Sequence, residues 1–224
     1  MKIYISLLLT LITHICAAQN LTWDSAYNNT YYEQKTTQHK LLVQAKKDII
    51  YLGNSITDIA EMAELWQNTH IKNRGISSDI TYGVLARLPQ ILNGKPAKIY
   101  LMIGINDISR NIPDSVIIAN YKRIITMVTS LSPRTKLVVQ SILPTNNNYT
   151  QFKNHQNKTE HILAVNNALK NICEAQKITY VNLYTSMVNA EGKLNPLYTN
   201  DGLHLTGAGY LQWMAVLKKL NLTP

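Results

Sequence analysis

Cysteine is scarce in this chain: Cys16 and Cys173 are the only two among 224 residues. So few cysteines exclude the disulfide framework on which many small secreted domains depend. A chain of this length hides roughly 70% of the surface that its unfolded form exposes, so it needs no such framework. Since 46% of the residues are hydrophobic and 16% are charged, the composition predicts a single globular domain and argues against a disordered chain.

Long apolar runs are also scarce, and none reaches the roughly 20 residues that a membrane-spanning helix needs. The longest, Ile3–Ile15, follows Lys2 and precedes Cys16-Ala17-Ala18, whose small residues suit a cleavage site. This pattern predicts a signal peptide over residues 1–18, cleavage near Ala18, and a periplasmic or extracellular protein. Lipidation of Cys16 and a retained N-terminal helix are the alternatives.

Acidic residues are outnumbered, with 13 Asp and Glu against 22 Lys and Arg, which gives a formal net charge of +9. Such an excess is compatible with nucleic-acid binding, a membrane surface or a basic soluble protein. The basic residues stand singly or in pairs such as Lys46-Lys47 and Lys218-Lys219, without a basic run or an RNA-binding signature. We therefore expect solvated basic faces, no nucleic-acid partner and no stable membrane insertion.

Metal-ligand spacing is missing as well. Asp201 and His204 could supply two ligands, but nothing nearby supplies a convincing third. Four other histidines lack such spacing and are interpreted as ordinary surface or core residues: His39, His70, His155 and His161.

Short apolar segments alternate with helical patterns from Asp48 onward, and no linker or internal repeat interrupts them. Near-continuous apolar strands are typical of a parallel sheet that helices cover on both faces. The predicted strands are Ile49–Leu52, His70–Asn73, Ile99–Ile103, Leu137–Ile142 and Thr179–Leu183. The predicted helices are Ile59–Trp66, Tyr82–Leu92, Asp114–Leu131, Glu160–Ala175 and Thr206–Leu220. Right-handed β-α units then predict a three-layer α/β/α sandwich with a five-stranded parallel sheet and a site at the carboxyl ends of its strands.

Two further segments complete the predicted organisation. Residues 19–47 are polar and rich in tyrosine, with a helix candidate over Glu33–Gln44, and we interpret them as a lead-in that packs on the main domain, residues 48–224. The Asn-rich segment Pro144–Lys158 is long and polar, so it is predicted to form a loop that borders the site.

Ser55 lies where the first predicted strand runs into a helix, within Gly53-Asn54-Ser55-Ile56-Thr57. A helix N-terminus at this point would direct free N–H groups at the negative charge that develops on an attacked carbonyl. The alternative is that the serine only caps the helix and has no catalytic role. A catalytic role requires a base and an orienting carboxylate.

Both groups occur near the far end of the chain, in Asp201-Gly202-Leu203-His204. A serine hydroxyl becomes an effective nucleophile when a histidine removes its proton and a carboxylate holds that histidine in one tautomer. Two other strand ends, Arg74-Gly75 and Gly104-Ile105-Asn106-Asp107, could offer a backbone N–H and a side-chain amide to an oxyanion, although each is also ordinary turn chemistry.

Together these residues resemble the SGNH hydrolases of the GDSL esterase/lipase superfamily. Four short blocks occur in the family's order, and Ser55, Gly75, Asn106 and His204 match the residues that give the family its name. The resemblance implies a flavodoxin-like SGNH hydrolase fold, with Ser55 as the nucleophile and His204, oriented by Asp201, as general base and then acid. It also implies an oxyanion hole formed by Ser55, Gly75 and Asn106, and no metal or organic cofactor.

The chain departs from the family pattern at Asn54, where the family usually has an Asp before the serine. We expect Asn54 to alter the catalytic rate without abolishing activity, since an amide still donates and accepts hydrogen bonds. The G-x-S-x-G motif of α/β-hydrolases is absent, and the carboxylate precedes the histidine by only three residues, which also favours the SGNH interpretation.

The expected function is that of a secreted serine esterase that hydrolyses small acyl esters, chiefly acetyl esters on carbohydrates. The chain lacks a long apolar lid segment near the site, and it resembles the sialate and polysaccharide acetylesterase branch of the family. The alternatives are a lysophospholipase or other lipid esterase, a thioesterase, and a non-catalytic carbohydrate-binding module with the same fold. A small-molecule or glycan ester is therefore the expected partner.

Overall fold

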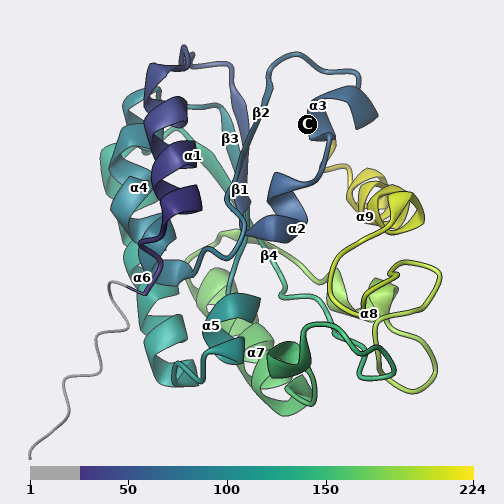
Figure 1. The fold of residues 1–224 in the computed structure, drawn as a ribbon. Helices are drawn as coiled ribbons and strands as arrows, with labels where there is room; N and C mark the ends of the chain where they lie inside the picture. The colour runs from purple at the N-terminus through teal and green to yellow at the C-terminus, as the bar shows by residue number, and fades with distance from the viewer. Residues whose placement is uncertain (1–25) are drawn as a thin grey trace, which may run out of the picture.

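A five-stranded parallel β-sheet forms the middle layer of the molecule in a computed structural model that describes residues 26–224 (Figure 1). The strands are β1 (Ile49–Gly53), β2 (Ile71–Gly75), β3 (Lys98–Met102), β4 (Lys136–Gln140) and β5 (Thr179–Val181). Their order is β2-β1-β3-β4-β5, and each neighbouring pair is parallel. The predicted α/β/α sandwich is confirmed, whereas the predicted signal peptide, residues 1–18 with Cys16, lies outside the described residues.

Helices cover both faces of this sheet (Figure 1). One face packs against α4 (Thr81–Asn93), α6 (Asp114–Leu131) and α7 (Thr159–Ala175), and the other against α2 (Ser55–Asp58), α3 (Met62–Leu65), α8 (Tyr184–Met187) and α9 (Gly207–Lys219). Successive side chains of β1 point to opposite faces, so Ile50 and Leu52 join the first core and Tyr51 joins the second.

An additional helix, α1 (Thr30–Leu41), lies outside the sandwich alongside α4 (Figure 1). The hydroxyl of Tyr32 donates to a backbone carbonyl of α4 at 2.7 Å. Tyr31 and Lys35 both bind the Asp58 carboxylate at 2.7 Å. Because Asp58 is the last residue of α2, this part of the lead-in is fastened to the helix that Ser55 begins.

The segment after β1 differs from the single helix predicted over Ile59–Trp66. It forms the two short helices α2 and α3 instead. Asn73 stabilises the break, because its Nδ2 donates to the carbonyls of Thr57 at 2.7 Å and Ala60 at 2.9 Å. The short helices α5 (Ile105–Ser109) and α8 were not predicted, since a helix of about one turn carries no periodic pattern.

The strand order places a topological switch point between β1 and β3. The chain leaves β1 toward β2 on one side and returns to β3 on the other, and ligands of open α/β sheets bind at the carboxyl ends of strands at such a switch point. Ser55 follows β1 and Asn106 follows β3, so both lie beside this switch point.

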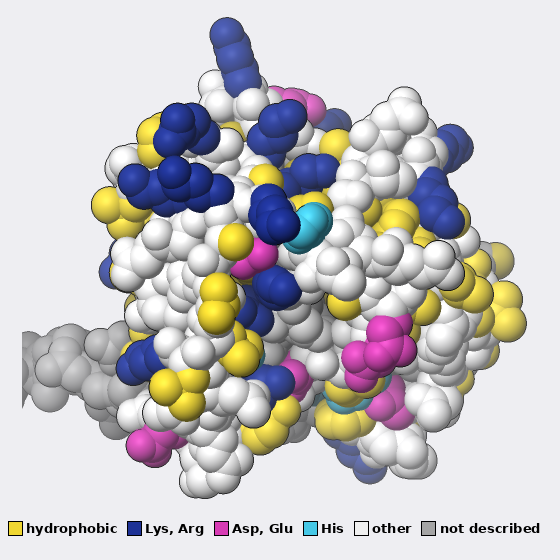
Figure 2. Space-filling model, turned by 90° about the horizontal axis from the view of Figure 1, so that it is seen from above, with side chains coloured by type: hydrophobic (Ala, Val, Ile, Leu, Met, Phe, Trp, Pro, Cys, Tyr) yellow, Lys and Arg dark blue, Asp and Glu magenta, His cyan; other side chains and the backbone are white. Residues whose placement is uncertain are grey.

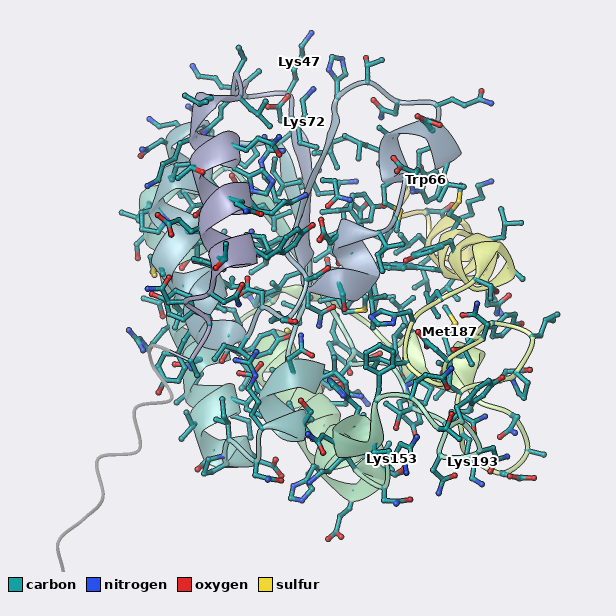
Figure 3. The ribbon with its side chains drawn as sticks, viewed as in Figure 1. Lys47, Trp66, Lys72, Lys153, Met187 and Lys193 are labelled. Carbon is teal, nitrogen blue, oxygen red and sulfur yellow. The ribbon has the colours of Figure 1, made fainter. Side chains whose placement is uncertain are left out.

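The opposite end of the sheet is basic. Lys47 and Lys72 mark this amino end in Figure 3, and Figure 2 views it from above, with many Lys and Arg side chains on it. Helices that connect parallel strands also end here, and cations near a helix C-terminus are stabilising. Part of the basic excess is therefore gathered at the end of the sheet away from Ser55.

Candidate active site

Ser55 is the first residue of α2, at the carboxyl end of β1. Asn54 caps this helix, because its Oδ1 accepts the N–H of Ile56 at 3.1 Å. A neutral amide caps a helix about as well as a carboxylate, so Asn54 fills this role without a charge. As the first helical residue, Ser55 has no carbonyl one turn earlier to bind its own N–H, which is left for another acceptor.

Ser55, His204 and Asp201 form a continuous chain of hydrogen bonds. Ser55 Oγ lies 2.9 Å from His204 Nε2, and His204 Nδ1 lies 2.7 Å from Asp201 Oδ2. An ionised carboxylate only accepts, so Nδ1 carries the ring proton and Nε2 presents a lone pair to the Ser55 hydroxyl. The three residues singled out in the sequence are thus brought together in the arrangement that activates a serine nucleophile.

The Asp201 carboxylate is fixed by its neighbours. Its Oδ1 accepts the backbone N–H groups of Leu203 and His204, both at 2.8 Å. Partial burial acts to raise the pKa of Asp201, but the hydrogen bonds from the His204 ring and from these N–H groups outweigh burial and lower the pKa below its usual value. Asp201 therefore remains charged at neutral pH.

Gly202 makes the tight turn between Asp201 and His204 possible. Its φ of +84° lies in the left-handed region, and a Cβ at this position would collide with the Asn146 carbonyl. The Gly202 N–H donates to Thr199 Oγ1 at 2.9 Å. The glycine thus lets the Asp201 segment lie directly against the loop that follows β4.

Asn106 follows β3 in α5, and two neighbours hold its amide. Its Nδ2 donates to the Asp79 carbonyl at 2.9 Å, and its Oδ1 lies 2.9 Å from His155 Nε2. A primary amide has two N–H bonds, so one of them remains for a substrate oxygen.

The Gly75 N–H has an acceptor within the chain. The resemblance implies that this N–H serves the oxyanion hole, and in the structure it donates to Asn73 Oδ1 at 2.8 Å. Asn73 lies two residues earlier on β2, and the carbonyls at the end of α2 hold its Nδ2, which leaves its Oδ1 facing Gly75. To bind an oxyanion as well, the Gly75 N–H would have to be shared between two acceptors. A separate steric reason requires the glycine, since a Cβ would collide with the backbone of Asp58.

A buried ion pair ties the strand ends together, and sequence patterns did not reveal it. Arg87 of α4 donates to the carbonyls of Gly53 at 3.0 Å and Arg74 at 2.6 Å, at the ends of β1 and β2. Its guanidinium also binds Asp79 Oδ2 through two N–H groups, at 2.8 and 3.0 Å. Because the Asp79 carbonyl in turn accepts from Asn106, one ion pair links the turn before Ser55, β2 and the Asn106 amide.

The predicted loop Pro144–Lys158 borders the site, and it contributes two side chains that the sequence interpretation did not assign there. Lys153 marks this loop in Figure 3. Phe152 is 42% exposed, and its ring meets the His204 ring edge-on with centroids 4.8 Å apart. His155, interpreted as an ordinary histidine, contacts Asn106. The sequence held one signal for Phe152, because the only phenylalanine of the chain stands in this polar, Asn-rich loop.

Residues 26–224 contain no group of three or more His, Cys, Asp or Glu side chains that could hold a metal ion. Within the same range, no helix combines the length and the apolar character needed to cross a bilayer.

A family model described as GDSL-like lipase/acylhydrolase matches residues 51–211, the stretch that includes Ser55 and His204. The chain belongs to this family. This GDSL-like acylhydrolase is therefore a carboxylic ester hydrolase, in agreement with a GDSL-like lipase among its structural neighbours. The comparison with curated proteins finds no match.

Solved structures similar to this GDSL-like acylhydrolase share its fold over most of their length. A Streptococcus pneumonia protein named for platelet activating factor is 30% identical, with a TM-score of 0.77, and the match covers 85% of this chain and 92% of that one. A GDSL-like lipase from Bacteroides thetaiotaomicron is 26% identical, with a TM-score of 0.73 and coverage of 84% and 96%. A catalytic mutant of an acetylxylan esterase from Geobacillus stearothermophilus is 17% identical, with a TM-score of 0.63 and coverage of 80% and 95%, a likeness of fold alone.

Proposed function

We propose that this protein is a serine esterase that removes short acyl groups, chiefly acetyl, from carbohydrates through a covalent acyl-enzyme. The observation that carries the proposal is the hydrogen-bonded chain from Ser55 Oγ through the His204 ring to the Asp201 carboxylate. A binding module without chemistry would have no need for a histidine held in the tautomer that accepts the serine proton.

The reaction follows from the direction of these bonds. Ser55 Oγ attacks the ester carbonyl carbon while its proton passes to His204 Nε2, and Asp201 stabilises the resulting imidazolium. The alcohol leaves with that proton and the acyl group stays on Ser55. Water then attacks the acyl-enzyme, gives a proton to His204, and releases the acid and the free serine.

The oxyanion that forms in both steps needs hydrogen-bond donors at the carboxyl ends of the strands. The Ser55 N–H and the second N–H of Asn106 Nδ2 supply two in the proposed mechanism. The Gly75 N–H is the third, shared with Asn73 Oδ1. One such donor contributes on the order of 10²–10³ to the rate, so the two unshared groups account for most of the stabilisation.

The loop that reaches the site through Phe152 favours a polar substrate. Its side chains Asn147, Asn148, Thr150 and Gln151 are exposed and polar, and the Phe152 ring lies against the His204 ring. Polar side chains can bind the hydroxyl groups of a sugar, and the aromatic ring can pack against its apolar face. The fold is shared with an acetylxylan esterase, which agrees with the proposal.

A second candidate is the hydrolysis of lipid esters. It is favoured by the neighbours named for platelet activating factor and for lipase activity, which are more similar in sequence than the acetylxylan esterase is. Phe152 would then contact the acyl chain or the glycerol backbone. A thioesterase has no comparable support.

An acyl-length series separates the two candidates. Purified protein is incubated with p-nitrophenyl esters of two to twelve carbons and with acetylated xylan, and acetate release is measured beside a Ser55→Ala control. Carbohydrate deacetylation predicts the highest kcat/KM for the acetyl ester and Ser55-dependent acetate release from the glycan. A maximum at eight or more carbons, with no acetate released, would replace it with the lipid esterase.

Activity should fall at acid pH. The general base must be neutral to accept the Ser55 proton, so kcat/KM is expected to rise with pH across the acid side of the profile and then to reach a plateau. Burial, and then the nearby His204, lower the pKa of His155 to about 4, and the pKa of Asp201 is also lowered, so neither group changes charge in this range. A flat profile from about pH 5 to 8 would count against His204 as the base.

Export is part of the proposal, because the N-terminal sequence has the pattern of a signal peptide. N-terminal sequencing of the mature protein tests it. A start near Gln19 is expected, and an intact Met1 in the cell-associated protein would argue against cleavage.

A further inference from the structure

We propose that His155 is a positioning residue for the oxyanion hole: its Nε2–H holds the Asn106 amide so that the second Nδ2 hydrogen faces the substrate oxygen. The inference rests on the proposed function, and it assigns a role to a side chain that stands far from the four sequence blocks.

The orientation of the Asn106 amide is determined by its partners. The Asp79 carbonyl can only accept, so the amide atom 2.9 Å from it must be Nδ2. The Oδ1 atom then faces His155 Nε2, also at 2.9 Å. Since an amide oxygen only accepts, His155 must carry its proton on Nε2. The Asp79 carbonyl thus fixes the orientation of the amide, and the amide oxygen in turn fixes the tautomer of His155.

With the proton on Nε2, His155 Nδ1 carries no proton and can only accept a hydrogen bond. The atom is buried and has no hydrogen-bond partner within the described part of the chain. A protonated ring would bury an N–H without a partner beside His204, which is costly. Burial, followed by the neighbouring His204, lowers the pKa of His155 to about 4, so the neutral ring with one donor persists at neutral pH.

The loop holds the His155 ring in place. The His155 N–H donates to the Phe152 carbonyl at 2.8 Å, and its own carbonyl accepts from Thr145 Oγ1 at 3.1 Å. The Phe152 ring lies edge-on to both the His155 and the His204 rings, at centroid distances of 5.9 and 4.8 Å. The same loop therefore contacts the general base and the proposed oxyanion donor.

Loss of the His155 donor would release one end of the amide. Asn106 is only 6% exposed, so its Oδ1 would lack a partner and the amide could rotate about its terminal torsion, which is broad. The N–H would then spend part of its time away from the oxyanion. The loss of one donor limits the effect to on the order of 10²–10³ in rate, and partial misalignment should cost about tenfold to a hundredfold.

Three substitutions test this role. His155→Gln places an amide N–H near the Nε2 position, His155→Met has similar length without a donor, and His155→Glu presents an acceptor to Asn106 Oδ1. We expect kcat for p-nitrophenyl acetate within about threefold of wild type for Gln, and about tenfold to a hundredfold lower for Met and Glu, with KM little changed. His161→Met, which removes an exposed histidine on α7 paired with Asp114, serves as the matched control.

A double-mutant cycle with Asn106 separates positioning from general destabilisation. If His155 acts through Asn106, then His155→Met should have little further effect on kcat in an Asn106→Ala background, although any loss of thermal stability would remain. Equal kcat for wild type and His155→Met, or a loss that is the same in both backgrounds, would overturn the inference. If His155→Met does not fold, the contrast between Gln and Glu decides, and equal kcat for those two variants would overturn it.

Failure of the proposed function is recognised separately. It would appear as an absence of Ser55-dependent hydrolysis in the wild-type protein. The His155 variants are compared only through the Ser55-dependent rate, so a negative result for His155 leaves the esterase assignment intact.

Discussion

Replacing Ser55 with alanine is expected to lower the kcat for p-nitrophenyl acetate by about 10⁴–10⁶-fold. The substitution removes the atom that would attack the carbonyl, and no other hydroxyl replaces it in the chain Ser55–His204–Asp201. Residual catalysis would come from the oxyanion donors and substrate binding alone.

The fold should survive this change, because Ser55 contributes only a small, buried hydroxyl at the start of α2. Circular dichroism and thermal unfolding check this point. Ser186→Ala, a serine on α8 outside the hydrogen-bonded chain, is the matched control and should keep full activity. A Ser55→Ala protein that keeps a substantial part of the wild-type kcat would disprove Ser55 as the nucleophile.

Replacing Asp201 with asparagine should lower kcat by about 10⁴-fold while the protein stays folded. The amide oxygen of asparagine can still accept the backbone N–H groups of Leu203 and His204, so the local turn is preserved. The other end of the side chain becomes an N–H₂ donor facing His204 Nδ1. This favours the tautomer with a bare Nδ1 and a proton on Nε2, which cannot accept the proton of Ser55.

The chain offers a matched control for this substitution. Asp114 also contacts a histidine, His161, with Oδ1 and Nδ1 3.1 Å apart, but on an exposed surface. Asp114→Asn should leave kcat unchanged. If Asp201→Asn and Asp114→Asn were equally active, Asp201 would not be orienting the base.

Much of the fold could be predicted from the prolines that bound helices and from the apolar runs that form strands. The predicted bounds of α6 agree with the structure, Asp114–Leu131, because Pro113 precedes the helix and Pro133 follows it. The strands were recognised from buried apolar runs, although β2 is less apolar than the others. Its polar residues have local roles, as Asn73 shows by binding both Gly75 and the end of α2.

The residues of the hydrogen-bonded chain were predictable because each stands at a strand end or a turn, where sequence blocks are short and distinctive. The supporting residues were not. Arg87 lies within a helix, and only the folded chain shows that it binds carbonyls at the ends of two strands. His155 has no motif around it, since its contact with Asn106 joins positions far apart in sequence. The sequence identified the block that contains Gly75, but it did not show that Asn73 Oδ1 accepts the Gly75 N–H.

The central claim is that Ser55 becomes covalently acylated, and labelling with a fluorophosphonate tests it most directly. Intact-protein mass spectrometry followed by peptide mapping should find one phosphonyl group per chain, on Ser55, and none in the Ser55→Ala variant. Labelling should slow strongly in the Asp201→Asn variant, because the base is then misaligned. A wild-type protein that stays unlabelled while folded, or that is labelled at another residue, would contradict the proposed mechanism.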